Sequence, residues 1–218
     1  MKLVADSHIP YLKGVFEPFF DVEYLPGHLI NREVVKDADV LIIRTRTICN
    51  QDLLQGSRVK FIASATIGYD HIDTQYCDSN GIRWETAPGC NAAAVQQRVA
   101  AALVKWISSN HLNPKTLTIG IVGIGNVGIK VVALGNALGM NVVCCDPPRA
   151  DRENIKSFVD LNELLKVSDI ITFHVPLTRA GNYPTYHMLS SKNLALCKPT
   201  AYFLNSSRGG VAVSYTHL

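Results

Sequence analysis

Short apolar runs alternate with amphipathic segments along most of the chain, and this alternation predicts its architecture. A short apolar run bounded by turn-forming residues is typical of a buried strand, whereas apolar positions three and four residues apart are typical of a helix. Strands that alternate with helices indicate an α/β fold with parallel sheets. Strands are predicted at 3–5, 22–25, 40–43, 61–63, 82–85, 117–122, 141–145, 169–173 and 201–204, and helices at 11–20, 32–36, 92–109, 127–138, 161–166 and 192–196.

The series divides in two near Asn91, where turn-forming residues lead into the long helix predicted at 92–109. We expect two doubly wound parallel-sheet domains, a flavodoxin-like domain over 1–91 and a Rossmann domain over 92–211. The second has only four predicted strands, and the usual six-strand order places the fourth strand beside the first. It is therefore expected to be incomplete, with its fourth strand as an uncovered edge.

The most informative motif joins an apolar strand to a helix through Gly123-Ile124-Gly125-Asn126-Val127-Gly128. The first glycine allows a tight turn, the middle one, Gly125, lets the backbone approach a pyrophosphate, and the third lets helix and strand pack closely. The N–H groups of Asn126 and Val127 then open a helix whose N-terminus favours an anion. Because a strand precedes the glycines and an acidic residue follows the next strand, the motif indicates a dinucleotide site.

That acidic residue is Asp146, about 20 residues beyond the glycines, where a carboxylate accepts hydrogen bonds from the adenosine ribose. It would repel the extra phosphate of NADP by roughly 1 to 4 kcal/mol at ~4 Å. NAD is therefore the predicted cofactor. Arg149 supports the alternative, since a nearby cation could accept that phosphate.

Composition narrows the classes of function. The chain has 218 residues, 47% of them apolar, which suits one large or two modest globular domains. The net charge of +3 is small and the basic residues are scattered, so nucleic-acid binding is not expected. The six cysteines lack metal-ligand spacing and are interpreted as reduced thiols. We find no signal peptide and no apolar run of about 18 residues, which predicts a cytoplasmic protein without a membrane segment.

Further motifs make the chain similar to the D-isomer-specific 2-hydroxyacid dehydrogenases, from Met1 to about Val211. Marks of that whole family are the glycine motif, Phe173-His174-Val175-Pro176-Leu177 and Asn205-Ser206-Ser207-Arg208-Gly209. More specific are Ala65-Thr66-Ile67-Gly68-Tyr69-Asp70-His71, Pro88-Gly89-Cys90-Asn91-Ala92 and Cys145-Asp146-Pro147-Pro148-Arg149-Ala150-Asp151-Arg152. The last motif favours a subgroup that acts on a phosphorylated hydroxy acid, because the fold does not require Pro-Pro-Arg after the acidic residue.

The resemblance implies oxidation of 4-phospho-D-erythronate to 2-oxo-3-hydroxy-4-phosphobutanoate in pyridoxal phosphate biosynthesis, with hydride passing to NAD in a homodimeric enzyme. Arg208 matches the catalytic arginine, whose guanidinium would hold the substrate carboxylate and the developing carbonyl. Thr45 and Thr66 match substrate-binding positions on loops after predicted strands. Positions expected around the cofactor are Gly125, Asn126, Val127, Asp146, Val175, Ser206, Ser207 and Arg208.

Several of these residues have a simpler interpretation. Thr45 and Thr66 could cap their own loops. Arg44 and Arg46 are a further hypothesis for the substrate's phosphate, yet they are as consistent with solvated surface charges. The histidines of the family motifs, His71 and His174, are interpreted as hydrogen-bonding packing residues.

The resemblance breaks after the arginine. Family members use a histidine as general acid/base, oriented by a glutamate, and both lie downstream of the arginine; neither is found here. Residues 212–218 do not fit the family pattern and are expected to be a non-native tail, so His217 is not the missing base. Because losing a positioned proton-transfer group costs about 10² to 10⁴ in rate, the chain as given is predicted to be inactive.

Three alternatives stay open. The first is another dehydrogenase of this family, of the phosphoglycerate or glycerate type, with the same cofactor machinery. The second is a non-catalytic, corepressor-like binding protein whose association is controlled by NAD, since a fold does not fix a function. The third is a non-functional fragment, which predicts insoluble protein without NAD binding.

Overall fold

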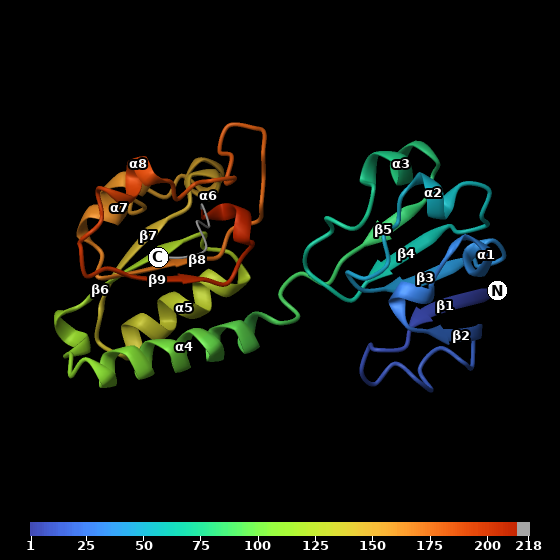
Figure 1. The fold of residues 1–218 in the computed structure, drawn as a ribbon, viewed down its shortest axis with the longest axis horizontal. Coiled ribbons are helices and arrows are strands. Elements are labelled where there is room, and N and C mark those ends of the chain that lie inside the picture. Colours follow the sequence, from blue (N-terminus) through green and yellow to red (C-terminus); the bar gives the residue numbers. More distant parts are fainter. Residues whose placement is uncertain (213–218) are drawn as a thin grey trace. The chain divides into compact units, whose positions relative to one another are not determined.

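The computed structural model describes residues 1–212. The chain folds as two compact units, the first from Met1 to Cys90 and the second beginning at Asn91 (Figure 1). In each unit helices pack on a parallel sheet, which confirms the predicted α/β class with two parallel-sheet domains. Among the described residues, no helix combines the length and apolar character needed to cross a membrane.

The first unit has a five-stranded sheet of order β2-β1-β3-β4-β5, the flavodoxin-like order that the sequence predicts. Its strands are β1 (Lys2–Asp6), β2 (Asp21–Leu25), β3 (Val40–Ile43), β4 (Phe61–Ser64) and β5 (Arg83–Glu85). Its helices are α1 (Arg32–Val35), α2 (Gln51–Leu54) and α3 (Thr74–Ser79), with a 3-10 turn at Gly27–Leu29. Because alternate residues of a strand face opposite ways, the sheet separates two cores. Val4 and Leu41 lie in one and Leu3 and Ile42 in the other.

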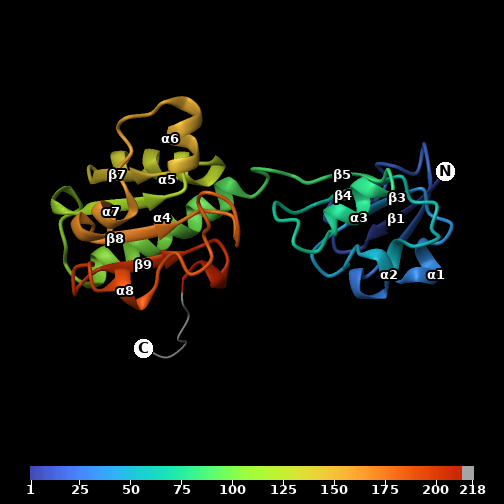
Figure 2. The ribbon, with the colours of Figure 1, turned by 90° about the horizontal axis from the view of Figure 1, so that it is seen from above.

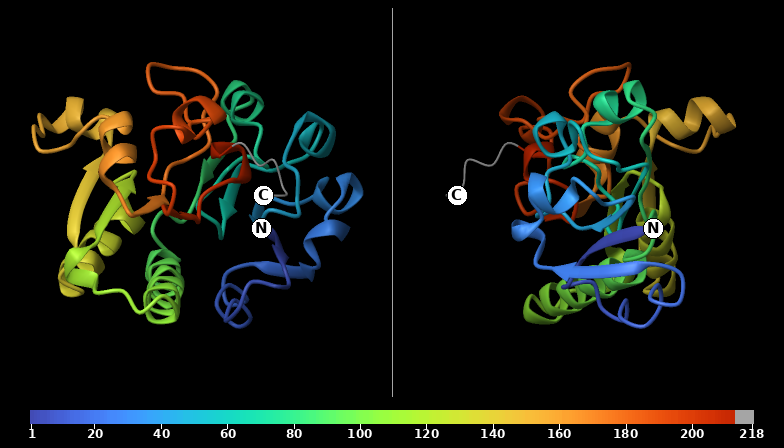
Figure 3. Two further views of the ribbon diagram at one scale, coloured as in Figure 1. Left: turned by 60° about the vertical axis from the view of Figure 1, so that its left-hand side comes forward. Right: turned by 90° about the vertical axis from the view of Figure 1, so that its right-hand side faces the viewer.

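The helix predicted at 11–20 is wrong. The segment forms turns and bends, drawn in Figure 3 as dark blue loops. Tyr11 and Gly14 have φ values of +60° and +86°, which a right-handed helix does not permit, and Pro18 removes a backbone donor. The apolar residues of this segment are nevertheless part of the core, because Leu12, Phe16 and Phe20 cover one face of the sheet.

The second unit has a four-stranded sheet of order β7-β6-β8-β9. Its strands are β6 (Thr118–Val122), β7 (Asn141–Cys145), β8 (Ile170–Phe173) and β9 (Tyr202–Asn205). Its helices are α4 (Ala92–Ser109), α5 (Asn126–Ala137), α6 (Pro147–Glu153), α7 (Leu161–Val167) and α8 (Ser191–Leu194), with 3-10 turns at Pro114–Thr116 and Gly209–Val211. Figure 1 shows α4 and α5 side by side on one face of this sheet.

The strand order of the second unit corrects the expected one. The third strand of the unit, β8, lies beside the first, β6, and the fourth, β9, is an edge strand, as can be followed in Figure 2. The reason is that α5 and α7 pack on opposite faces: α5 shares a core with Ile119 and Ile121, and α7 shares one with Val122. Right-handed crossovers on opposite faces lead the chain in opposite directions, so β8 falls on the far side of β6 from β7.

This reversal places a topological switch point between β6 and β8, where open α/β sheets bind ligands beyond the carboxyl ends of their strands. Gly120 makes the close packing of α7 possible, because a Cβ there would lie 2.5 Å from Leu164. Of the predicted tail at 212–218, only Ala212 lies within the described residues, where it forms a bridge with Leu189.

Candidate functional site

The glycine motif forms the turn between β6 and α5, directly at the switch point. Gly123 has a φ of +88°, and a Cβ there would lie 2.7 Å from both the His174 carbonyl oxygen and Val175 Cγ1. A Cβ on Gly128 would lie 2.0 Å from the Gly123 carbonyl oxygen, so the third glycine lets the helix approach the turn. A Cβ on Gly125 would meet nothing within 4 Å. The middle glycine therefore borders open space, as a loop that receives a phosphate requires.

The N-terminus of α5 is open toward that space. The helix begins at Asn126 with Gly125 as its N-cap, and no side chain caps it. The first N–H groups of a helix have no acceptor within it, and they carry the positive end of the helix dipole. With Asn126 exposed and Val127 partly exposed, this terminus offers amide donors to an anion.

Asp146 lies beside this turn, as expected for the acidic residue after the second strand. It caps α6 by accepting a hydrogen bond from the Arg149 N–H at 3.0 Å through Oδ1. Its Oδ2 accepts from the Ile124 N–H at 2.7 Å. The carboxylate is therefore fixed against the glycine loop, and lone pairs remain on both oxygens for ribose hydroxyls.

The carboxyl ends of β8 and β9 are tied together by side chains of the family motifs. His174 Nδ1 lies 2.7 Å from Ser206 Oγ, and its Nε2 lies 3.0 Å from Thr172 Oγ1. Burial lowers the pKa of His174 from 6.5 to about 4, so the ring is neutral at pH 7. Ser207 donates to the Phe173 carbonyl at 3.2 Å. The interpretation of His174 as a hydrogen-bonding residue is confirmed, and Ser206 and Ser207 lie on the same edge as the glycine loop.

Arg208 follows these serines and precedes the last 3-10 turn. Its carbonyl accepts from Asn205 Nδ2 at 3.0 Å and from the Val211 N–H at 3.0 Å, so the backbone at this position is fixed on both sides. The side chain is exposed. A fixed backbone with a solvent-accessible guanidinium is suited to binding a carboxylate.

The first unit brings Thr45 and Thr66 to the carboxyl ends of two neighbouring strands, β3 and β4. Thr66 Oγ1 donates to the Gly68 carbonyl at 3.1 Å and lies 2.7 Å from Ser64 Oγ. Ser64 Oγ in turn lies 3.0 Å from Nε2 of His71, which is 5% exposed. His71 is thus a packing residue, as interpreted, and Thr66 does fasten its own loop. Thr45 is exposed, as are Arg44 and Arg46 beside it.

The same edge carries a polar group that the sequence interpretation missed. Asp6 ends β1 and is 2% exposed, and its Oδ1 accepts from the His8 N–H at 2.9 Å. Arg44 Nη1 donates to the His8 carbonyl at 3.3 Å. The signal was present as a run of polar residues directly after a buried strand, at the edge where Thr45 also lies.

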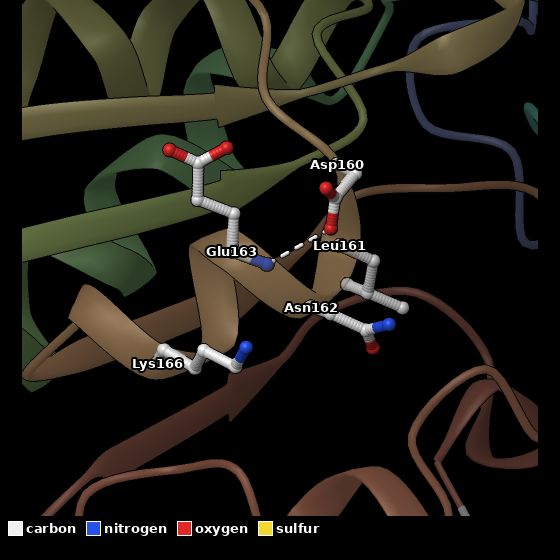
Figure 4. Close-up of a pocket in the computed structure, with 5 residues that line it drawn as sticks. All are labelled: Asp160, Leu161, Asn162, Glu163 and Lys166. Atoms are coloured by element: carbon white, nitrogen blue, oxygen red, sulfur yellow. Dashed lines mark hydrogen bonds between the residues drawn. The ribbon is translucent and has the colours of Figure 1, made fainter.

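A separate pocket opens at the start of α7 and is shown in Figure 4. It is lined by Asp160, Leu161, Asn162, Glu163 and Lys166. Asp160 caps the helix by accepting a hydrogen bond from the Glu163 N–H at 2.9 Å, and the Glu163 carboxylate points away from Asp160 in the figure. None of the residues predicted to bind a dinucleotide or substrate lines this pocket. Among residues 1–212, no cluster of His, Cys, Asp and Glu could hold a metal ion.

Comparison with known sequences assigns each of the two units to a domain of one protein family. Residues 2–99 match the D-isomer specific 2-hydroxyacid dehydrogenase, catalytic domain, and residues 91–215 match the D-isomer specific 2-hydroxyacid dehydrogenase, NAD binding domain. The chain belongs to this family, and its second unit is the family's NAD-binding domain. The geometry fits that cofactor, because Gly125 borders open space, α5 presents an uncapped N-terminus and Asp146 is held beside both.

Within the family, the chain is most informatively compared with erythronate-4-phosphate dehydrogenases. It is 48% identical over 212 residues to the one from Bacteroides thetaiotaomicron and 42% identical over 213 residues to the one from Porphyromonas gingivalis. These matches cover 97% of this chain, and 61% and 58% of the respective relatives. The chain thus spans about three fifths of the length of these curated relatives.

Solved structures give the same fold. A D-lactate dehydrogenase from Aquifex aeolicus, complexed with NAD and lactic acid, is 25% identical with a TM-score of 0.77 over 98% of this chain and 71% of that one. An NAD-bound 3-phosphoglycerate dehydrogenase from Entamoeba histolytica is 23% identical with a TM-score of 0.82 over 97% of this chain and 73% of that one. The second likeness shows the fold alone.

Proposed function

We propose that this protein oxidises the 2-hydroxyl of 4-phospho-D-erythronate to 2-oxo-3-hydroxy-4-phosphobutanoate, a step toward pyridoxal phosphate, with NAD as hydride acceptor. The observation that carries the proposal is the 48% identity to an erythronate-4-phosphate dehydrogenase over nearly the whole of this chain. Solved structures of lactate and phosphoglycerate enzymes match at lower identity, 25% and 23%. The proposal extends to a homodimer that works in the cytoplasm.

Different residues of the second unit would bind different parts of the cofactor. The amides of Gly125, Asn126 and Val127 would bind the pyrophosphate, and Asp146 would accept from the adenosine ribose; the uncapped start of α5 and the position of Asp146 beside the glycine loop support this. Backbone of Val175 and the loop at Ser206 and Ser207 lie across the switch point, on the nicotinamide side in this proposal. When bound, NAD supplies the hydride acceptor, and the chain binds and orients the reactants and stabilises charge.

Arg208 would be the catalytic arginine. A guanidinium offers paired donors to a carboxylate and stabilises negative charge on the oxygen of a forming carbonyl. Its fixed backbone, held by Asn205 and Val211, supports that role. The general acid/base is proposed to come from a segment downstream of Arg208, as the family resemblance implies.

The first unit carries further residues that are proposed to bind substrate. Thr45 and Thr66 would contact the hydroxy acid, and their position at the carboxyl ends of β3 and β4 supports this role. Arg44 and Arg46 flank Thr45 and are exposed, so they are our candidates for the phosphate group.

The test is a substrate panel on the complete gene product. NADH formation is measured with 4-phospho-D-erythronate, 3-phospho-D-glycerate, D-glycerate and D-lactate at equal concentrations. The proposal expects 4-phospho-D-erythronate to have the highest kcat/KM by at least about tenfold, since an unsatisfied buried recognition group is costly. A higher value for phosphoglycerate or glycerate would assign another dehydrogenase of the family. NAD-dependent partner binding without turnover would favour a corepressor-like protein.

A further inference from the structure

Both backbone polar groups of Ile124, the residue between the first two glycines, are held by the segment that follows β7. Asp146 Oδ2 accepts a hydrogen bond from the Ile124 N–H at 2.7 Å. Arg149 Nη1 donates a hydrogen bond to the Ile124 carbonyl oxygen. Ile124 is 5% exposed, with its side chain in the core under α5. The N-cap residue and the first turn of α6 therefore bind both backbone polar groups of Ile124, at the centre of the glycine loop.

The bond from Arg149 determines the direction of a neighbouring amide. The Ile124 carbonyl and the Gly125 N–H belong to one peptide unit, and in a planar trans peptide these two groups point in opposite directions. Fixing the carbonyl toward Arg149 therefore fixes the Gly125 N–H away from it. Gly125 is the residue whose Cβ position borders open space at the start of α5.

The guanidinium of Arg149 is itself held. Its Nε donates to Glu153 Oε2 at 2.8 Å, an i,i+4 contact along α6, and the side chain is 26% exposed. Glu153 also accepts from Arg152 Nη2 at 2.9 Å. These two arginine contacts hold the pKa of Glu153 below its usual value, so the carboxylate is charged at neutral pH.

We propose that Arg149 is a positioning residue of the dinucleotide site, which holds the Ile124 carbonyl so that the Gly125 amide faces the pyrophosphate. Its charge is engaged by Glu153 rather than presented to a 2′-phosphate. The proposal rests on the proposed NAD-binding role of this loop. It replaces the alternative in which Arg149 accepts the extra phosphate of NADP.

The experiment compares Arg149→Met with Arg152→Met in the chain of 218 residues. Arg152 is a matched control, because it lies on the same helix and contacts the same Glu153. NAD and NADP are titrated calorimetrically into each variant. Arg149→Met should weaken NAD binding about tenfold, the effect of losing one charge-assisted hydrogen bond, while Arg152→Met stays within about twofold of the parent. Equal affinity in the two variants would overturn the proposal.

The NADP titration separates positioning from direct phosphate binding. Under the proposal, Arg149→Met weakens NAD and NADP by the same factor, because both share the pyrophosphate. A much larger loss for NADP would show that Arg149 binds the 2′-phosphate and would overturn it. Glu153→Gln should raise NADP affinity relative to NAD severalfold, because it releases the guanidinium.

A second readout does not depend on cofactor. Amide hydrogen exchange at residues 123–125, measured without NAD, should be faster in Arg149→Met and unchanged in Arg152→Met, because only the first variant releases the loop. Arg149→Lys, which has one point-like donor group in place of the fork, is expected to restore slow exchange only in part. Unchanged exchange in Arg149→Met refutes the positioning role. Absence of NAD binding in the parent chain would instead count against the proposed function.

Discussion

Lowering the pH should destabilise the second unit through one residue, His174. The ring bridges Thr172 and Ser206, and burial lowers its pKa from 6.5 to about 4. Between these two values the unfolded chain binds a proton that the folded unit does not, so the free energy of unfolding falls as the pH falls. The difference between these two pKa values corresponds to about 3 kcal/mol of unfolding free energy, of which about 2 kcal/mol is lost between pH 7 and pH 5.

The assay is urea unfolding at pH 7 and pH 5, followed by tryptophan fluorescence. The chain has two tryptophans, one in each unit, and Trp106 stacks on Tyr202 with ring centroids 5.0 Å apart. Trp84→Phe therefore leaves Trp106 as a reporter of the second unit. The comparison variant is His174→Gln in this background, because glutamine keeps a donor and an acceptor but does not titrate in this range.

The parent should lose about 2 kcal/mol more than His174→Gln when the pH is lowered from 7 to 5. Other titrating groups affect both proteins alike, so the difference isolates this histidine. Equal losses in the two proteins would refute the reasoning, since they would mean that His174 binds its proton equally well in the folded and unfolded states.

The remaining predictions concern the two proposed sites. Gly125→Ala should change the free energy of unfolding by less than about 1 kcal/mol yet weaken NAD at least about tenfold by calorimetry, because its Cβ enters open space. Gly128→Ala should cost about 1 to 3 kcal/mol in urea unfolding, because its Cβ would lie 2.0 Å from the Gly123 carbonyl; equal stability of the two variants would contradict this. Thr66→Val in the complete gene product should lower kcat/KM for 4-phospho-D-erythronate about tenfold while KM for NAD is unchanged, and a changed KM for NAD alone would argue against substrate contact.

The parts of the fold that depend on local pattern were predictable from the sequence. Gly123 and Gly128 each have a local steric reason to be glycine, Gly125 borders open space, and the turn that the three predict between strand and helix is present. Asp146 follows its strand at the expected place beside that turn. These features depend on residues within one β-α-β unit, so the sequence spacing alone determines them.

The parts that depend on distant contacts were not predictable. The segment at 11–20 has helical spacing, but positive φ values at Tyr11 and Gly14 direct its apolar residues onto the sheet without a helix. The order of β7, β6, β8 and β9 depends on which face α7 covers, which single-strand patterns do not reveal.

The contacts of Arg149 at the dinucleotide site were likewise not predictable from the sequence. Its position near Asp146 supported the alternative of a phosphate ligand, but its contacts with the Ile124 carbonyl, 25 residues earlier in the chain, and with Glu153 could not be predicted. The roles of Thr45, Thr66 and Arg208 stay predictions, since contact with a substrate depends on the shape and charge of that substrate, which residue spacing does not reveal.

The most direct test of the account is amide hydrogen exchange of this chain with and without NAD. We predict that NAD slows exchange at 124–128 and at the backbone near Asp146, Val175 and Ser206, and leaves the pocket at Asp160 to Lys166 unchanged. Slowed exchange confined to that pocket, or none at the glycine loop with NAD bound, would contradict the assignment of the dinucleotide site.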